Sequence, residues 1–342
     1  MTKQQAIDAF HSDDLIGIGM EADAVRRNLH PEGVATYIID RNINHTNLCT
    51  EYCSFCAFYR PMGHTEGYVL AKEVIFQKIQ ETIDLGGTGV LMQGGVNPDL
   101  KIEYFEDLFR SIKSRFSIHL HCLSAPEILT IAEVSGLTIR DTIARLRDAG
   151  LDSIPGAGAE VLDDEVRRRI ARLKCNTAEW IDVHRTAHAL GLRTTATMMF
   201  GCGETIEHRV NHLETLRRLQ EETGGFTAFI PWPFQPEHTS LGKRIREETT
   251  AVEFLKTLAI SRIYLDNFVN VQTSWVTQGL KVCQLGLRFG GNDVGSVMLE
   301  ENVVRQAGAS HQASEEDLRR MIRDAGFVPK QRDTLYRTYF LN

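Results

Sequence analysis

The feature that most constrains the fold of this chain is a regular alternation of short apolar runs with amphipathic segments. Eight runs have the length and composition of β-strands. Between them, segments such as Glu73–Leu85 and Arg209–Glu222 carry apolar residues at helical spacing. Strands that alternate with helices favour a parallel sheet covered by helices. The strand-like runs span residues 35–44, 89–95, 117–124, 153–158, 194–201, 226–234, 267–275 and 289–298.

Eight such strands without a long linker favour an α/β fold that closes into a TIM-type (β/α)8 barrel, rather than an open doubly wound sheet. We expect three regions: an N-terminal helical extension over residues 1–34, the barrel over residues 35–300, and a C-terminal helical segment over residues 301–342 packed on the barrel. In that last region, Ser314 followed by acidic residues marks a helix start. Barrels of this kind place their chemistry where the strands end.

Composition excludes some classes of partner. The 342 residues carry a net charge of −7, with 42% hydrophobic and 24% charged residues. These values are typical of a globular protein and disfavour a nucleic-acid partner, which would require a basic face. The first residues lack the apolar core of a signal peptide, and no run reaches the roughly eighteen apolar residues of a membrane span. We therefore expect a cytoplasmic protein with no nucleic-acid and no membrane partner.

Cys49, Cys53 and Cys56 stand together in the segment after the first predicted strand. The spacing C-x3-C-x2-C supplies three thiolates, the ligands of iron–sulfur clusters, and no fourth. A [4Fe–4S] cluster bound in this way keeps one iron open to another ligand. A zinc site would take its fourth ligand from His45 or His64, but the run lacks the paired C-x2-C design of zinc ribbons. We expect the scattered cysteines to be packing residues in a reducing compartment: Cys122, Cys175, Cys202 and Cys283.

With Phe55 between its last two cysteines and Ala57-Phe58-Tyr59-Arg60 after them, the cysteine run resembles the signature of the radical S-adenosylmethionine (SAM) superfamily. The resemblance implies a radical SAM barrel and two cofactors. One is a [4Fe–4S] cluster held by Cys49, Cys53 and Cys56. The other is SAM, whose amino and carboxylate groups chelate the open iron. We assign Phe55 to cofactor binding.

Two further stretches are candidates for cofactor binding. The second predicted strand ends in Met92-Gln93-Gly94-Gly95, where glycines let a ligand approach the backbone closely. In the resembling superfamily a glycine-rich stretch here binds the methionyl amino group of SAM, so we assign Gln93, Gly94 and Gly95 to that role; an ordinary tight turn is the alternative. Glu160 could accept hydrogen bonds from ribose hydroxyls or a cofactor amine, or it could cap the next helix.

Two residues are candidate proton acceptors. Asp293 lies in Gly290-Gly-Asn-Asp293-Val-Gly295, where a carboxylate between glycines at a barrel strand is hard to explain by packing. Hydrogen bonding to the backbone of a bulge is its alternative role. His121 shares one face of the third strand with His119. These histidines could line the cavity, or hydrogen bonds between strand and helix could satisfy both.

A wider set of motifs places the resemblance in the branch that contains the futalosine-route enzymes of menaquinone biosynthesis and the deazaflavin F0 synthases. The set comprises Asn42-Ile-Asn44 with Asn47, the cysteine run, Pro155–Glu160 and Gly290–Asp293. The stretch Phe229-Ile-Pro-Trp-Pro-Phe-Gln-Pro236 is similar to the family that cyclises dehypoxanthine futalosine. Aminofutalosine synthases and F0 synthases differ at its Trp-Pro-Phe-Gln core. His45 departs from the branch, where tyrosine is more usual.

That resemblance implies a radical SAM oxidoreductase, a cyclase, whose substrate is dehypoxanthine futalosine. A 5′-deoxyadenosyl radical would take the C4′ hydrogen of the ribose, and the C4′ radical would add to the benzoate ring. Loss of one electron and one proton would restore aromaticity, with Asp293 or His121 as the proton acceptor. Flavodoxin or ferredoxin would serve as the external one-electron reductant. Candidates for binding the substrate carboxylate are Arg60, Arg288 and Thr273, and candidates for stacking on its ring are Trp232 and Phe234.

Two alternative functions remain open from the sequence. The first is an aminofutalosine synthase or an F0-synthase-type radical SAM enzyme, which would need room for two organic substrates. The second is non-enzymatic, an iron–sulfur carrier or a zinc-stabilised scaffold. A full barrel would be superfluous for holding one cluster, so the sequence favours an enzyme.

Overall fold

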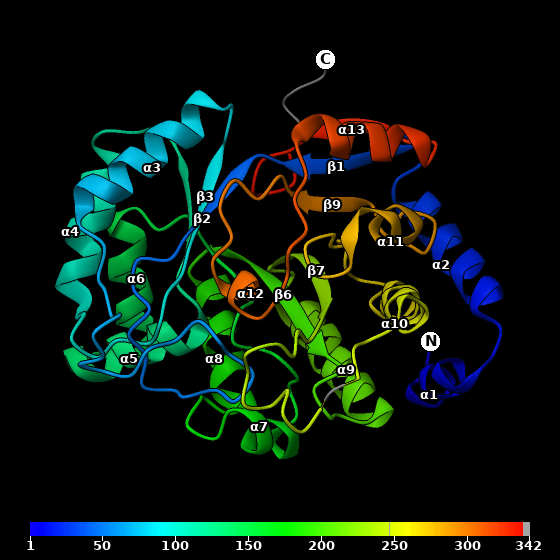
Figure 1. Ribbon diagram of the computed structural model, residues 1–342, viewed down its shortest axis with the longest axis horizontal. Coiled ribbons are helices and arrows are strands. Elements are labelled where there is room, and N and C mark those ends of the chain that lie inside the picture. Colours follow the sequence, from blue (N-terminus) through cyan, green and yellow to red (C-terminus); the bar gives the residue numbers. More distant parts are fainter. Residues whose placement is uncertain (246, 338–342) are drawn as a thin grey trace.

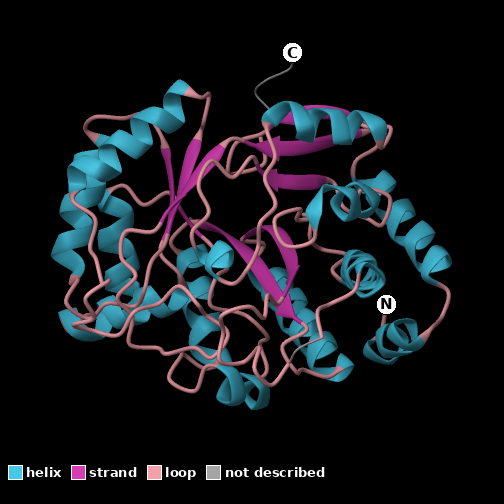
Figure 2. Cartoon of the chain, viewed as in Figure 1, coloured by secondary structure: helices cyan, strands magenta, loops and turns pink. Residues whose placement is uncertain are grey.

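A computed structural model describes residues 1–245 and 247–337. Parallel strands occupy its centre and helices cover the outside (Figures 1 and 2). The strands are β1 Val34–Ile38, β2 Asp40–Ile43, β3 Gly89–Met92, β4 His119–Cys122, β5 Ser153–Ile154, β6 Arg193–Phe200, β7 Phe226–Pro233, β8 Asn270–Val271, β9 Asp293–Ser296 and β10 Val328–Gln331. Strands β2 to β8 pair in sequence order, each parallel to the next.

The ring of strands closes through β9. Strands β1 and β2 are two halves of one bent strand, with Ile39 between them. Strand β9 pairs with β1, and a parallel bridge joins Gln272, directly after β8, to Asp293 at the start of β9. Eight strand positions therefore form a closed barrel, which confirms the predicted (β/α)8 fold.

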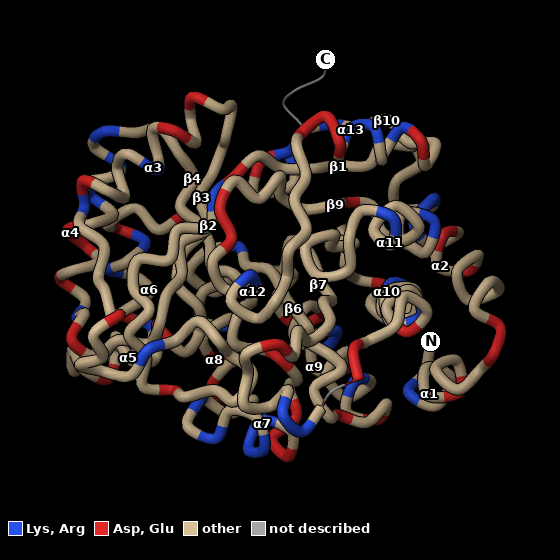
Figure 3. The backbone as a smooth tube through the Cα atoms, viewed as in Figure 1, with Lys and Arg blue, Asp and Glu red and all other residues tan. Residues whose placement is uncertain are grey.

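Helices α3 to α11 cover the barrel, and two more precede it. Their bounds are α1 Lys3–His11, α2 Leu15–Leu29, α3 Lys72–Asp84, α4 Ile102–Lys113, α5 Ala125–Ser135, α6 Ile139–Ala149, α7 Asp164–Ile170, α8 Thr177–Ala189, α9 Ile206–Thr223, α10 Ala251–Tyr264 and α11 Gly279–Gly286. Along the backbone of these helices, Lys and Arg positions are interspersed with Asp and Glu positions (Figure 3). No helix within the described residues is long and apolar enough to span a bilayer.

The sequence patterns predicted the positions of the strands correctly, but several strands are shorter than predicted. Strand β5 ends at Ile154 because Pro155 has no N–H to continue the ladder. The predicted N-terminal helical stretch is two helices, since the Asp14 side chain accepts a hydrogen bond from Gly17 N at 2.8 Å and starts α2 there. Apolar side chains fill the space between strands and helices, with Trp180 and Phe229 fully buried.

The C-terminal region contains more than the helical segment we predicted. Helices α12 Val303–Gln306 and α13 Glu315–Asp324 are present, and Ser314 caps α13 as expected. After α13 the chain forms a strand instead of a further helix, because β10 pairs in parallel with β1, with Val328 opposite Val34. The chain after β10 then enters the end of the barrel where the strands begin.

Candidate active site

A cavity of about 410 Å³ occupies the interior of the barrel. Residues on or directly after every barrel strand line it, so the whole ring contributes to its wall. We call its two ends the mouth and the base. The mouth contains Cys49, Glu51, Cys53, Cys56, Gln93, Gly94, Gly95, Glu127, Glu160 and Lys174; the base contains Asp40, His121, Ser296, Arg332, Thr334 and Tyr336.

The three predicted cluster ligands lie together at the mouth as free thiols. Cys49 and Cys53 are buried and Cys56 is half-buried. Burial raises the pKa of all three thiols, and the Lys174 ammonium opposes that shift by favouring the thiolates. Three thiols on one loop, open to a cavity and beside a cation, fit a cluster that has one open iron.

The alternative zinc ligands point elsewhere. His45 Nε2 lies 3.8 Å from Glu127 Oε1, and its ring meets Phe105 edge-on. His64 Nδ1 accepts a hydrogen bond from Glu66 N at 3.1 Å. In the described part of the chain, no three His, Cys, Asp or Glu side chains gather closely enough to hold one metal ion. The arrangement therefore does not favour a zinc site.

Glu160 and Lys174 form an ion pair beside the cysteine loop. Lys174 Nζ donates to Glu160 Oε1 at 2.8 Å and lies 5.3 Å from the centroid of the Phe55 ring. Glu160 has a φ of 41°, a left-handed conformation that costs energy in a non-glycine residue. Its buried Oε2 lies 3.6 Å from Arg167 Nη1 and accepts no hydrogen bond from any described residue. Asp163 caps the next helix, which removes the helix-cap alternative for Glu160.

The stretch after β3 also presents a free acceptor. Gln93 lines the cavity, and its buried Oε1 has no hydrogen-bond donor among the described residues. A buried amide oxygen without a partner is costly, so this atom fits a ligand amine. The glycines have a further role that we did not predict. A Cβ at Gly95 would lie 2.2 Å from the Leu48 carbonyl oxygen, so the backbone packs directly on the cysteine loop.

Two acidic residues at the mouth were not predicted from the sequence. Glu127 accepts hydrogen bonds from Gly94 N at 3.0 Å and from Ser124, and burial raises its pKa to about 7. Burial likewise raises the pKa of Glu51 to about 7, and Glu51 Oε2 has no donor within the described chain. Glu127 follows Ser124 by three residues, which is the spacing of a helix capping box. The sequence therefore indicates only a capping role for Glu127, although its side chain also binds the backbone of the predicted SAM-binding stretch.

The histidine candidate lies at the base, and its hydrogen-bond partner is on the neighbouring strand β5 rather than on a helix. His121 lines the cavity, while its Nδ1 lies 2.6 Å from Ser153 Oγ. His119 Nε2 lies 2.7 Å from the same oxygen but does not line the cavity. Burial lowers the pKa of His121 to about 3, so the ring is neutral.

The aspartate candidate is fully buried behind the base. Asp293 Oδ2 accepts hydrogen bonds from Thr36 Oγ1 at 2.6 Å and Arg332 Nε at 2.5 Å. Its Oδ1 accepts from Arg332 Nη2 and Gly295 N, each at 2.9 Å. Two donors on each oxygen and a bidentate guanidinium leave no basic lone pair toward the cavity, and Asp293 is not among its lining residues. Its role as proton acceptor stays a prediction.

Another carboxylate does face the cavity at the base. Asp40 begins β2 and is half-buried because one side of it faces the interior space. Ser296 Oγ donates to its Oδ1. Burial raises the pKa of Asp40 to about 6, against the hydrogen bond from Ser296 and the charge of Arg332, which lower it.

None of the three side chains proposed for the substrate carboxylate lines the cavity. Arg60 binds Glu66, Arg288 packs on Phe327, and Thr273 bonds to the Cys283 carbonyl. The cavity's described cations are Lys174 and Arg332 instead. Of the two aromatic candidates, Trp232 lines the cavity, whereas Phe234 is buried in a cluster that includes Cys53.

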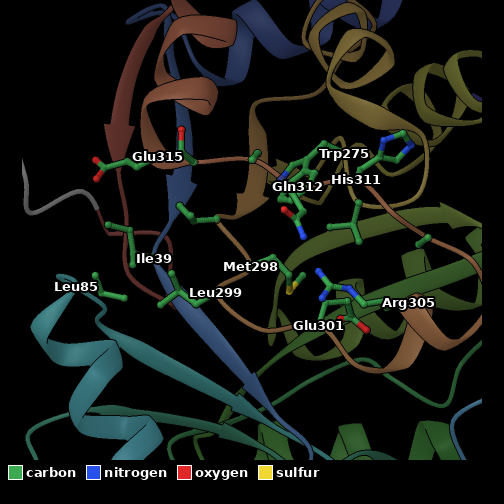
Figure 4. A pocket seen from close by; sticks show the side chains of 15 residues that line it. Ile39, Leu85, Trp275, Met298, Leu299, Glu301, Arg305, His311, Gln312 and Glu315 are labelled. Carbon is green, nitrogen blue, oxygen red and sulfur yellow. The ribbon is translucent and has the colours of Figure 1, made fainter.

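A second hollow of about 520 Å³ lies outside the barrel wall, between β9 and α13. Figure 4 shows its apolar floor, with Trp275, Met298 and Leu299, and the charged side chains of Glu301 and Arg305 at its edge. It shares Val276, Met298 and Glu301 with the central cavity, and it contains none of the predicted site residues.

Matches to known families cover both ends of the cavity. Residues 43–216 match the model of the radical SAM superfamily, and residues 223–341 match the model described as the CofH/MqnC C-terminal region. The first segment contains the whole mouth. The second contains Ser296, Arg332 and Tyr336 of the base, so the cavity draws on both.

Curated relatives match over nearly the whole chain. The cyclic dehypoxanthine futalosine synthase of Halalkalibacterium halodurans is 48% identical over 98% of this chain and 90% of its own. The enzyme of that name from Streptomyces coelicolor is 44% identical over 98% and 85%. The 5-amino-6-(D-ribitylamino)uracil–L-tyrosine 4-hydroxyphenyl transferase of Methanothermobacter thermautotrophicus is 42% identical over 95% and 90%.

Solved structures share the fold at low identity. Methylornithine synthase superposes with a TM-score of 0.75 at 17% identity, over 96% of this chain and 94% of its own. The FeFe-hydrogenase maturase HydG from Carboxydothermus hydrogenoformans gives a TM-score of 0.77 at 17% identity, over 100% and 78%. At this identity the match concerns the barrel alone.

Proposed function

Because this chain belongs to the radical SAM superfamily and shares its C-terminal region with the CofH/MqnC family, we propose that it cyclises dehypoxanthine futalosine in menaquinone biosynthesis. One observation carries the proposal: a single cavity joins three free cysteine thiols at its mouth to a buried polar base. The curated relatives with 48% and 44% identity bear the name of that activity.

The mouth supplies the residues that would hold the cofactors. Cys49, Cys53 and Cys56 would ligate a [4Fe–4S] cluster, and SAM would complete the coordination of its open iron. The free oxygens of Gln93 and Glu160 are acceptors for the SAM amino group or ribose hydroxyls. When bound, these cofactors supply the radical that removes a hydrogen atom from the substrate ribose.

The rest of the chain positions the substrate and keeps water away. Helix α12 lies in front of the strands in Figure 1, and its Val303 and Val304 line the cavity. Glu301 accepts hydrogen bonds from Val304 N at 2.8 Å and from Asn42 Nδ2 at 3.2 Å, which ties this helix to β2. An enclosed site favours attack of the ribose radical on the tethered ring over side reactions.

A second function is favoured by one observation. The relative at 42% identity is a 4-hydroxyphenyl transferase, and such an enzyme must hold two organic substrates. The single central cavity favours one tethered substrate. The second hollow lies outside the barrel, and it has only wall residues in common with the central cavity.

The proposal is tested by anaerobic reconstitution of the cluster and incubation with SAM, a reductant and dehypoxanthine futalosine. We expect 5′-deoxyadenosine together with a product that is lighter than the substrate by two hydrogen atoms. A parallel reaction contains L-tyrosine and 5-amino-6-(D-ribitylamino)uracil. Product only in the second reaction would establish the transferase, and 5′-deoxyadenosine in neither would contradict both functions.

We also propose flavodoxin or ferredoxin as the external reductant and the cytoplasm as the location. All seven cysteines are free, which suits a reducing compartment. Tyr52, between two of the predicted ligands, is 46% exposed, so the cysteine loop reaches the surface where an electron donor can approach. Reduction of the cluster by each protein, followed by electron paramagnetic resonance, tests this partner.

A further inference from the structure

The base of the cavity contains a carboxylate that the sequence motifs did not reveal. Asp40 lies on the inner face of the bent first strand, together with Ile38, Asn42 and Asn44. These residues alternate along the chain, so they point to the same side of the strand. Asp40 therefore faces the interior of the barrel, directly after the apolar residues Ile38 and Ile39.

The two oxygens of Asp40 have different surroundings. Oδ1 accepts the hydroxyl of Ser296, which is fixed in turn because its Oγ accepts from Met298 N at 2.7 Å. No described residue donates a hydrogen bond to Oδ2. One oxygen is thus held in place by β9, while the other is free toward the cavity.

The other acidic residues of the cavity are occupied or belong to the mouth. Both oxygens of Glu127 and both of Glu301 accept hydrogen bonds from the protein. Glu160 is paired with Lys174, and Glu51 lies between two predicted cluster ligands. These last two face the space that the cofactors would fill. The substrate must then lie toward the base, where Asp40 is the free carboxylate among the described residues.

Charges around Asp40 come from two neighbouring elements. Arg332 and Tyr336 approach from the segment after β10, and Asp293 and Ser296 approach from β9. The bidentate pair with Asp293 neutralises Arg332. Asp40 therefore keeps its basicity, whereas a single unpaired arginine next to it would suppress it.

We propose that Asp40 is the proton acceptor that restores the aromatic ring in the cyclisation, an inference that rests on the proposed function. After ring closure, the C–H bond at the attacked ring carbon breaks. Its proton passes to Asp40 Oδ2, and its electron pair stays with the ring, which becomes a radical anion. One electron then leaves to an oxidised acceptor of the iron–sulfur class, so that the neutral aromatic product remains.

The geometry favours Asp40 over the two other candidates. Asp293 has two donors on each oxygen and does not line the cavity, so we infer that it positions Arg332. His121 does line the cavity, but burial lowers its pKa to about 3, which makes it a weak base. The pKa of Asp40, about 6, is nearer to the working pH of a cytoplasmic enzyme.

The decisive variant is Asp40→Asn, which keeps the size of the side chain and removes its basicity. We expect 5′-deoxyadenosine within about threefold of the original chain, while cyclic product per 5′-deoxyadenosine falls about 100-fold or more, because a general base typically supplies that factor. Uncyclised or reduced cyclised species should replace the product. Thermal unfolding of the variant, measured alongside, shows that its fold is retained.

Two matched variants distinguish Asp40 from the other two candidate proton acceptors. Asp293→Asn and His121→Gln are assayed in the same way, and either one overturns the proposal if it splits the two yields while Asp40→Asn does not. Normal cyclisation by Asp40→Asn overturns this inference alone. Absence of cyclic product from the original chain would overturn the proposed function and this inference together.

Two further measurements test Asp40 by means other than the product yield of Asp40→Asn. Ser296→Ala removes the hydrogen bond that lowers the pKa of Asp40, so the pH profile of the cyclic yield should shift to higher pH. Infrared spectra of the protein without cofactors should show a protonated carboxyl that titrates near pH 6 and is missing from Asp40→Asn. An unshifted profile, or an unchanged carboxyl band, would contradict the assignment.

Discussion

The mouth and the base of the central cavity are both polar, but they are assembled differently. The mouth is built mainly from one loop, with its three cysteines within eight residues of sequence, and from the stretches after β3 and β5. The base joins Asp40 of β2 to Ser296 of β9, and it joins Asp293 of β9 to Arg332 beyond β10. The mouth has buried oxygen atoms that accept no hydrogen bond from the described residues, whereas most charged side chains at the base are paired with one another. Short motifs therefore mark cofactor binding, while substrate chemistry depends on long-range packing.

Removal of one thiol should disable the mouth and leave the base intact. We expect Cys53→Ala to lose the [4Fe–4S] cluster and all SAM cleavage, because two thiolates cannot hold the cluster. Iron content, visible spectra and 5′-deoxyadenosine formation measure the loss. Cys122→Ala is the matched control, since Cys122 is also buried but lies in the apolar core. A cluster that survives in Cys53→Ala with full turnover would contradict the ligand assignment.

Removal of the buried cation should disrupt the base and leave the mouth intact. Arg332→Met leaves Asp293 charged, buried and unpaired, so the free energy of unfolding should fall by about 3–5 kcal/mol. Urea denaturation measures the change. The double variant Arg332→Met/Asp293→Asn removes both charges and should recover part of the loss. If the two single effects simply add, the pair is not coupled as its geometry indicates.

The titration of Asp40 should distinguish the base from the mouth through the pH dependence of stability. Its pKa is raised from 3.8 to about 6 in the folded chain. The folded state then binds the proton more tightly than the unfolded state, so stability falls as pH rises from about 4 to 6, by about 3 kcal/mol in total. Asp40→Asn lacks this loss. The free energy of unfolding of Asp40→Asn, minus that of the original chain, should therefore be about 3 kcal/mol larger above pH 6 than near pH 4. A difference that does not change with pH would contradict the shift.

The smallest expected effect concerns the free acceptor at the mouth. Gln93→Leu removes one hydrogen bond to SAM and should weaken SAM binding by about 1–2 kcal/mol, roughly five- to thirtyfold. Equilibrium dialysis with the cluster-loaded protein measures the affinity. Gln93→Glu keeps an acceptor and serves as the control. Gly94→Val would be a poor substitute, because a Cβ at Gly94 lies 2.8 Å from the Thr46 carbonyl oxygen. Unchanged affinity in Gln93→Leu would place the amine elsewhere.

The contrast between mouth and base also explains how much the sequence could predict. Alternating patterns predicted the barrel, and local spacing predicted the three cysteines. Gln93 was predicted from the resemblance of its glycine-rich stretch to the superfamily, and Glu160 from the turn of small residues before it. Lys174 carries no local signal, because its importance comes from its contact with Glu160. The role of Asp293 was inferred from flanking glycines, but its partner Arg332 is brought to it only when β10 pairs with β1. These contacts depend on the closed fold.

Asp40 is different, because a usable signal was present in the sequence. Polar residues occupy positions 40, 41, 42 and 44 of the first strand. Those at 40, 42 and 44 share one face of the strand, and in a closed parallel barrel one of the two faces points inward. An acidic residue on that face is costly to bury unless it is hydrogen-bonded or paired, so its presence there makes it a candidate functional residue. The glycines around Asp293 form a more conspicuous local pattern than the polar face of the first strand.

The pairing of β10 with β1 also bears on how the protein is made. Strand β1 leaves the ribosome early, but one of its edges finds its partner only after residues 328–331 have been synthesised. Parallel pairing between such distant segments forms slowly, and an unpaired edge invites association with other chains. Until then the barrel lacks Arg332 and Tyr336 at its base. The cysteine loop of a nascent chain is therefore complete well before the base, so the proposed cluster site can form before the chamber that would enclose the substrate.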